Sequence, residues 1–222
     1  MTEGLILTGY SLSVYTRAAR MALVARGLEA GAVECDPFGE AGARHLQGLH
    51  PFGRVPVLEH GAFRLWETQA ILDYLDTLGG APPLTPSGPR PRARMRQVMG
   101  IVDSYLYWPL VRQVFSNAVF QPMAGEAADA AQIAEGLRKA GPVLDALEEI
   151  AGEGLVLRPG ERTLADCLLW PMLDYFGMAP DGAAMLAERP ALAGWGRDMQ
   201  ACPVALATKP PLEALLKEGH TA

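Results

Sequence analysis

The amino-acid sequence predicts a mixed α/β unit followed by an all-helical unit, and three observations support this division. Short apolar runs alternate with helical patterns up to residue 79. The segment GGAPPLTPSGPRP, from Gly79 to Pro91, carries glycines and prolines that cannot continue a helix. After this segment no stretch has a convincing strand pattern. We therefore expect a sheet-containing domain over residues 1–79, a linker over 80–91 and a helical domain over 92–222.

The first unit is expected to form a mixed four-stranded sheet with helices over it. Gly27 is well placed to end a helix that is rich in alanine, leucine and arginine. His60-Gly61, between two short apolar runs, predicts an antiparallel hairpin. We expect strands at Leu5–Thr8, Ala32–Cys35, Val55–Glu59 and Ala62–Trp66, and helices at Thr16–Arg26, at Gly39–Gly48 and from Glu67 onward. This order is βαβα followed by ββα.

The second unit shows only helical spacing. One apolar stripe predicts a first long helix, in which Pro109 is expected to cause a bend. A second stripe predicts another helix, in which Pro142 is expected to interrupt the hydrogen bonding. The first stripe is Met95, Val98, Val102, Tyr105 and Leu106, and the second is Ile133, Leu137, Ala140, Leu144, Leu147 and Ala151. Thr163 and Asp166 have the spacing of a capping box, so we expect them to hold a third helix and to do no chemistry.

Composition excludes several classes of protein. The chain has 222 residues, of which 50% are hydrophobic, so it can bury a sizeable core. The net charge of −6 argues against a nucleic acid or an anionic membrane as partner. The three cysteines lack metal-site or disulfide spacing, which fits a cytoplasmic protein without a metal. Neither a signal peptide nor a transmembrane run is apparent.

Three short segments carry the candidate chemistry. The first, Ser11 to Arg17, lies between the first strand and the first helix. The second is HPFGRVPVL, from His50 to Leu58, and the third is WETQAILDYL, from Trp66 to Leu75. In these motifs the chain resembles the cytosolic glutathione transferases, which carry an N/H-P-x-G-x-V-P-x-L segment and then an acid-hydroxyl pair before A-I-x-x-Y-L. The S/T-x-x-D capping box in the helical part extends the resemblance over nearly the whole chain.

The resemblance implies a thioredoxin-like glutathione-binding domain and a helical domain that contributes the site for the electrophile. It implies a homodimer, in which the first domain of one subunit packs against the second domain of its partner. Glutathione would be the co-substrate, and the other substrate would be a hydrophobic electrophile or a peroxide. The Ser13–Arg17 spacing is similar to that of the serine-type, bacterial-like members. A cysteine in this loop, as other members have, is missing.

The resemblance also implies where glutathione binds. Pro56 is expected to follow a cis peptide bond, as in the family, so that the backbone of Val55 can pair with the cysteinyl part of glutathione. Glu67 and Thr68, at the start of a helix, suit the ammonium and carboxylate of the γ-glutamyl end. Arg54 is expected to meet the glycyl carboxylate, with help from His50.

Ser13 is the expected catalytic residue, because a hydroxyl donor beside a helix N-terminus favours a thiolate over a thiol. Ser11, Tyr10 and Tyr15 are alternatives, since their hydroxyl groups lie within three residues of Ser13. Ser13 could also serve simply as a helix cap.

The electrophile is expected to contact the first long helix, where the candidates are Tyr105, Trp108, Arg112 and Phe115. Aromatic residues at helical spacing are equally typical of a core. The main alternative to an enzyme is a binding or regulatory protein on the same fold, because a fold does not fix a function.

Overall fold

The computed structural model describes residues 4–210 and residue 212. In that part of the chain, the sheet has the strand order β2-β1-β3-β4. Strand β1 (Leu5–Gly9) pairs in parallel with β2 (Ala30–Glu34) and antiparallel with β3 (Val57–His60). Strand β3 continues into β4 (Phe63–Trp66) through a hairpin in which His60 pairs with Phe63. The mixed four-stranded sheet predicted from the sequence is therefore confirmed.

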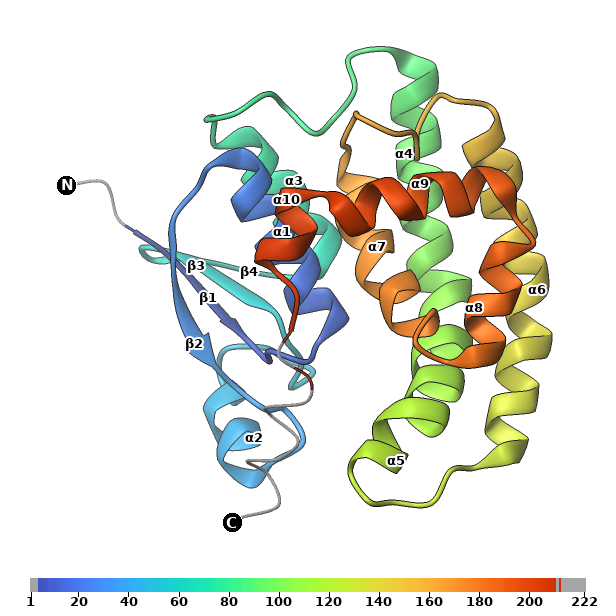
Figure 1. Cartoon of the computed structure of the whole chain (residues 1–222). Coiled ribbons are helices and arrows are strands. Elements are labelled where there is room, and N and C mark those ends of the chain that lie inside the picture. Colours follow the sequence, from blue (N-terminus) through green and yellow to red (C-terminus); the bar gives the residue numbers. More distant parts are fainter. Residues whose placement is uncertain (1–3, 211, 213–222) are drawn as a thin grey trace.

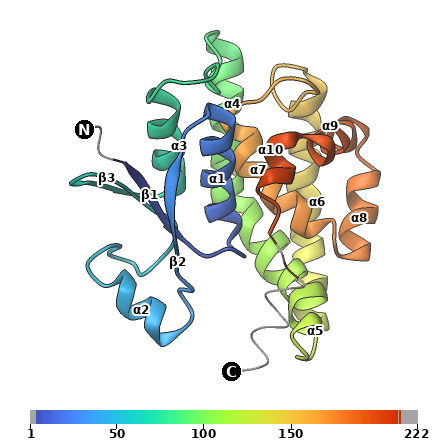
Figure 2. The same ribbon diagram turned by 60° about the vertical axis from the view of Figure 1, so that its left-hand side comes forward.

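Two helices separate the sheet from the helical unit. Helices α1 (Val14–Arg26) and α3 (Thr68–Thr77) pack against each other between the sheet and the bundle (Figure 1). Helix α2 (Glu40–Leu46) lies away from them, as Figure 2 shows. It buries Leu46 in a separate small cluster with Cys35 and Val57. Because Leu58, the neighbour of Val57, faces the main core, α2 covers the opposite face of the sheet.

Local sequence explains where these elements end. Gly27 follows α1 in the left-handed conformation, with φ of 63°, and its N–H group bonds to the last carbonyls of the helix. Gly61 turns the hairpin with φ of 58°, another conformation that glycine adopts without strain. Each predicted strand and helix of the first unit is present, with bounds shifted by a few residues.

The second unit consists of helices in the described residues, as the sequence predicts. After the long helix that begins with α4, the chain forms α6 (Ala130–Gly152), α7 (Leu164–Phe176), α8 (Pro180–Ala187), α9 (Pro190–Ala201) and α10 (Pro203–Ala207). Helix α4 (Pro89–Ile101) begins inside the segment expected as linker, because proline is tolerated at the first position of a helix. None of the helices described is long and apolar enough to cross a membrane.

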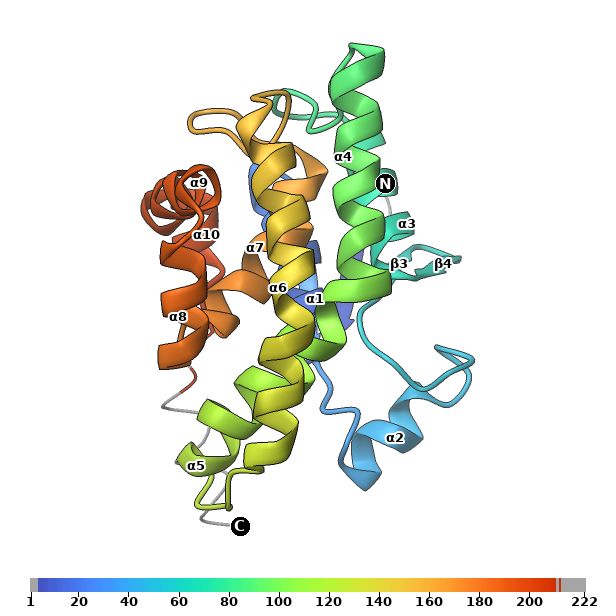
Figure 3. The ribbon, with the colours of Figure 1, turned by 90° about the vertical axis from the view of Figure 1, so that its right-hand side faces the viewer.

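The long helix does not end at Pro109. After α4 it continues through wide π-type turns, η1 (Val102–Leu106) and η2 (Trp108–Phe120), and closes with α5 (Gln121–Met123). Pro109 is the second residue of η2, where its missing N–H group interrupts the ordinary ladder. Helix α6 runs beside this long helix (Figure 3) and continues through Pro142, which has no N–H group to donate to the ladder.

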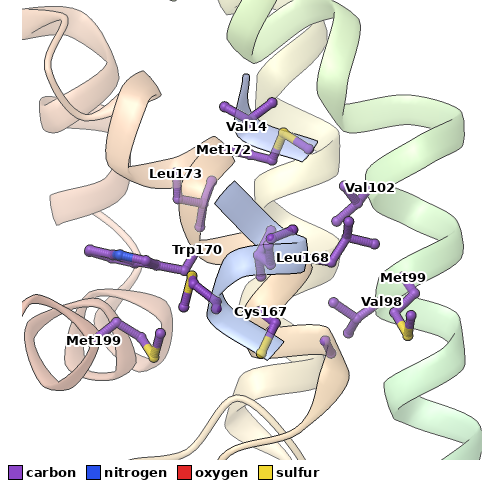
Figure 4. Close-up of a cluster of buried hydrophobic side chains, with 14 of the residues drawn as sticks. Val14, Val98, Met99, Val102, Cys167, Leu168, Trp170, Met172, Leu173 and Met199 are labelled. Atoms are coloured by element: carbon purple, nitrogen blue, oxygen red, sulfur yellow. The ribbon is translucent and has the colours of Figure 1, made fainter. Parts of the chain in front are cut away.

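Helix α7 forms the centre of the helical unit. Its capping box is confirmed, since the Asp166 carboxylate accepts the N–H of Thr163 at 2.7 Å. The same buried carboxylate also accepts the indole N–H of Trp195 at 2.6 Å, a contact that ties α9 to α7. In Figure 4, side chains of α7 lie between those of α1, α4 and α9, which join in one core. Helix α10 then returns to pack against α1 (Figure 1).

Candidate active site

A cleft of about 460 Å³ opens where the first unit meets the long helix of the second. Its floor comes from the loop before β3 and from the start of α3. The facing side of the cleft comes from the first turn of α1 and from η1 with the residue that follows it. The lining residues are Tyr15, His50, Phe52, Arg54, Val55, Pro56, Glu67, Thr68, Asp103 and Tyr107.

The structure brings all six residues expected to hold glutathione into this cleft. They come from two segments, the loop at 50–56 and the start of α3 at 67–68. The peptide bond between Val55 and Pro56 is cis, as the sequence predicts. Thr68 is the first residue of α3, so its hydroxyl lies beside the unpaired backbone N–H groups of the helix. An anion bound there would also meet the positive end of the helix dipole.

Glu67 has an unusual backbone conformation. Its φ is 71° and its ψ is 115°, outside the region that non-glycine residues normally occupy. Such a conformation costs about 1–3 kcal/mol and is found where a fixed orientation serves a ligand. Glu67 makes no side-chain hydrogen bond to the start of its own helix. Its carboxylate is therefore free to meet a cationic group in the cleft.

His50 also lines the cleft, and its surroundings favour the neutral form of its imidazole. Burial and the charge of Arg54 lower the pKa of its imidazole, although the nearby Glu67 carboxylate opposes them. The Nδ1 atom accepts the N–H of Phe52 at 3.1 Å. Because Nδ1 is an acceptor, the hydrogen of the neutral ring lies on Nε2, where it can be donated. Arg54 and His50 together offer donors suited to a carboxylate.

The helical unit supplies a wall that sequence reasoning did not assign. Asp103 accepts a hydrogen bond of 2.7 Å from Nε2 of Gln69, which also bonds to the carbonyl of Met99. Burial and the Asp103 carboxylate raise the pKa of Tyr15, so this phenol stays protonated. The rings of Tyr15 and Tyr107 lie 5.0 Å apart between centroids. In the sequence, the four-residue spacing of Asp103 and Tyr107 indicated that both lie on one face of a helix. It did not indicate that this face of the helix meets the sheet unit.

Ser13 caps α1 from the turn beside the cleft. Its Oγ accepts the N–H of Thr16 at 3.2 Å, and its own N–H donates to the carbonyl of Tyr10. Ser13 is partly exposed and is not among the residues that line the cleft, whereas Tyr15 is. The competing Ser11 has a different partner, because its hydroxyl donates to the Glu34 carboxylate at 2.5 Å.

Helix α7 contacts the turn that contains Ser13 and the helix that follows it. The hydroxyl of Tyr175 donates to the carbonyl of Leu12 at 3.1 Å, and its ring stacks on Phe115. Arg17, four residues after Ser13, is buried and pairs with Asp174 at 2.5 Å. Arg17 therefore joins α1 to α7, and its charge is balanced there.

The four side chains expected near the electrophile lie in different surroundings. Tyr105 and Trp108 are 65% and 59% exposed and lie outside the residues that line the cleft. Phe115 is buried against Tyr175. Arg112 is partly buried, with its guanidinium 5.7 Å from the ring centroid of Phe38. The wide turns of η1 and η2 change which residues share a face, and this explains why ordinary helical spacing did not separate them.

Comparison with known proteins identifies the family of this chain. The family model described as the N-terminal domain of glutathione S-transferase matches residues 7–83. Glutathione S-transferase F14 of Arabidopsis thaliana is 32% identical over 77% of this chain and 68% of its own length. A glutathione S-transferase of Hyoscyamus muticus is 31% identical over 70% of this chain and 73% of its own. This chain belongs to the glutathione S-transferase family.

The fold comparison extends the likeness to the helical unit. A solved structure of glutathione S-transferase III in apo form superposes with a TM-score of 0.80 at 26% identity. It covers 94% of this chain and 97% of that one. The thioredoxin-like first domain and the helical second domain are thus those of a glutathione S-transferase. Both of the relatives named here come from plants, whereas the Ser13–Arg17 spacing is similar to that of the serine-type, bacterial-like members.

Proposed function

We propose that this protein is a glutathione transferase that presents the thiolate of glutathione to a hydrophobic electrophile. The observation that carries the proposal is the meeting of six residues in one cleft, although they come from two separate segments of the sequence. A binding protein without activity need not keep both an ammonium site and two carboxylate sites. Residues 1–79 would bind glutathione, and the helical unit after the linker would complete the electrophile site.

Glutathione has three charged groups, and the cleft offers a partner for each. The γ-glutamyl carboxylate suits the hydroxyl of Thr68 and the start of α3, and the ammonium suits Glu67. The glycyl carboxylate suits Arg54 and the Nε2–H of His50. Val55 also lines the cleft, and its backbone would pair with the cysteinyl residue as an added strand does. The thiol would then face the first turn of α1, from which Tyr15 lines the same cleft.

Ser13 is our candidate for activation of the thiol. Its oxygen already accepts a hydrogen bond from Thr16, so its hydrogen is free to be donated to a sulfur. Lowering a thiol pKa by about two units requires about 2.7 kcal/mol, and one hydrogen bond to a charged group contributes roughly 1.5–3 kcal/mol. One hydrogen bond from a hydroxyl group is therefore nearly sufficient to lower the thiol pKa by this amount. Ser11 and Tyr15 are weaker candidates, because Glu34 and Asp103 already hold their hydroxyl groups.

The thiolate sulfur would form a bond to the electrophilic carbon as the leaving group departs, which gives a thioether. With a peroxide, the sulfur would attack one oxygen and release the other as an alkoxide. Proximity in the cleft would provide much of the rate. Such chemistry serves detoxification. The three cysteines are free, which fits the reducing cytoplasm.

A homodimer follows from the same proposal. Phe52, on the rim of the cleft, is 66% exposed, and Tyr105 and Trp108 expose large aromatic surfaces on the long helix. Exposed aromatic groups on both units are typical of an interface between subunits. Sedimentation equilibrium would measure the mass, and a monomer at micromolar concentration would contradict this part of the proposal.

The function is tested by retention on immobilised glutathione together with turnover of 1-chloro-2,4-dinitrobenzene. We expect both to occur, and absence of both would refute the enzyme. Binding without turnover of any of several electrophiles would favour the non-enzymatic alternative. The Ser13→Ala variant should lose roughly 10- to 100-fold in kcat/KM, as expected for one lost charge-assisted hydrogen bond. The thiol pKa of the bound glutathione should rise in this variant.

Ser11→Ala is the matched control, because it removes a hydroxyl from the same turn. It should leave the thiol pKa of the complex unchanged. A larger effect for Ser11→Ala than for Ser13→Ala would move the catalytic role to Ser11.

A further inference from the structure

Arg112 lies over the ring of Phe38, and within the part of the chain that the structure describes it has no partner of opposite charge. Among the residues that the structure describes, no carboxylate lies within 4.0 Å of its guanidinium. The guanidinium carbon lies 5.7 Å from the centroid of the Phe38 ring. A cation that is partly buried over an aromatic face keeps its N–H donors available for an acceptor.

The location ties this charge to the proposed chemistry. The ring of Phe38 also contacts Tyr10, with centroids 6.4 Å apart in an edge-on arrangement. The carbonyl of Tyr10 accepts the N–H of Ser13 at 2.9 Å. The side chains of Tyr10, Phe38 and Arg112 thus form one cluster, which is joined to the candidate catalytic serine through the backbone of Tyr10. The cluster combines two aromatic rings with one cation.

The carboxylates near this cluster come from the end of β2 and the residues after it, which we call the strand side; Arg112, on η2, lies on the helix side. Glu34 accepts the N–H and hydroxyl of Ser11, and Asp36 accepts the N–H of Phe38 at 2.9 Å. Burial raises the pKa of Tyr10, and the negative charges of Asp36 and Glu34 raise it further. An anionic group of a ligand would be repelled from the strand side and attracted to the helix side. The charges therefore orient an anionic ligand as well as attract it.

We propose that Arg112 selects aromatic electrophiles that carry a carboxylate, an inference that rests on the proposed transferase function. The substrate ring would lie against Phe38 and Tyr10, and its carboxylate would accept two hydrogen bonds from the guanidinium. The thiolate would then form a bond to the ring carbon that loses halide. Arg112 binds and orients the substrate and takes no part in the exchange of bonds.

The test compares two aryl chlorides that share the ring and the leaving group, the negatively charged 4-chloro-3-nitrobenzoate and its uncharged methyl ester. In Arg112→Gln, kcat/KM for the benzoate should fall roughly tenfold or more, as for a lost charged hydrogen bond, while the value for the ester should change less than twofold. Dividing each value by that of the unmodified protein cancels the different reactivity of the two chlorides. Arg138→Gln is the matched control, since Arg138 is exposed on α6 and pairs with Glu135.

Ionic strength gives a second readout. Added salt should lower kcat/KM for the benzoate and not for the ester, and Arg112→Gln should abolish this difference. An equal loss for both substrates, or no loss for the benzoate, would overturn the inference while the transferase function stands. If the unmodified protein turns over 1-chloro-2,4-dinitrobenzene but not the benzoate, the inference fails while the transferase function stands. If it neither binds glutathione nor turns over 1-chloro-2,4-dinitrobenzene although it is folded, the proposed function fails and the inference with it.

Discussion

The hydroxyl of Ser13 can serve two partners because it both accepts and donates. It accepts the N–H of Thr16 as the cap of α1, which fixes the direction of the oxygen, and its hydrogen remains available. The neighbouring hydroxyl groups are held elsewhere by carboxylates, Ser11 by Glu34 and Tyr15 by Asp103. The hydroxyl groups of Ser11 and Tyr15 are therefore held by carboxylates, whereas the hydrogen of Ser13 remains available to a sulfur.

His50 gives a prediction about pH at the scale of one residue. Burial lowers the pKa of its imidazole below the ordinary value of about 6.5. The unfolded chain therefore binds more protons than the folded one, and the free energy of unfolding decreases as the pH falls below about 6.5. In His50→Gln this decrease between about pH 7 and pH 5 should be less steep, as urea titrations would measure.

His45→Gln is the control for this experiment, because His45 lies nearby on α2 and is exposed. An identical slope for His50→Gln and for the unmodified protein would show that His50 does not titrate differently in the folded state.

At the scale of one element, α3 begins at a strained residue. Glu67 has positive φ, so Glu67→Gly should raise the free energy of unfolding by about 1 kcal/mol, because the cost of this conformation exceeds the extra freedom of glycine in the unfolded chain. Retention on immobilised glutathione should decrease in the same variant, since the carboxylate is lost.

Glu67→Gln separates the two effects, because it keeps the side chain and the strain but removes the charge. It should reduce glutathione binding without a gain in stability. If Glu67→Gly bound glutathione as well as the unmodified protein, Glu67 would have no role at the ammonium.

At the scale of the whole molecule, α7 connects the helical domain to the turn of Ser13. Tyr175 is buried, and its hydroxyl bonds to the carbonyl of Leu12, the residue before Ser13. Tyr175→Phe keeps the stacking on Phe115 and removes only this bond. We expect kcat to fall several-fold, as for a loss of about 1 kcal/mol, with little change in KM for glutathione.

The pH profile of kcat distinguishes positioning from folding in this variant. A displaced Ser13 should shift the thiol pKa upward, whereas simple destabilisation would lower the active fraction at every pH. Tyr175→Leu should cost more stability, because it also removes the stacked ring. An unchanged kcat in Tyr175→Phe would mean that the turn keeps its position without α7.

The strands and most helix ends follow from local sequence. Gly27 and Gly61 adopt positive φ at little cost, and Thr163 with Asp166 forms a cap within one turn. These features depend on neighbours a few residues away, so the pattern of residue types is sufficient. The meeting in one cleft of the residues that we propose to hold glutathione was predictable for a similar reason, because they lie in two compact motifs.

Contacts between distant segments were not predictable in this way. The Asp166–Trp195 bond, the wall formed by Asp103 and Tyr107, and the approach of Arg112 to Phe38 join residues that are far apart in the sequence. The wide turns around Pro109 also rotate the long helix away from its ordinary period.

By itself, therefore, the sequence determined the two-domain fold and the segments expected to hold glutathione, since local hydrogen bonds and apolar spacing specify them. Only the tertiary structure decided which side chains of the second domain face those segments. The packing of the long helix against the sheet unit sets that choice, and it depends on the whole core.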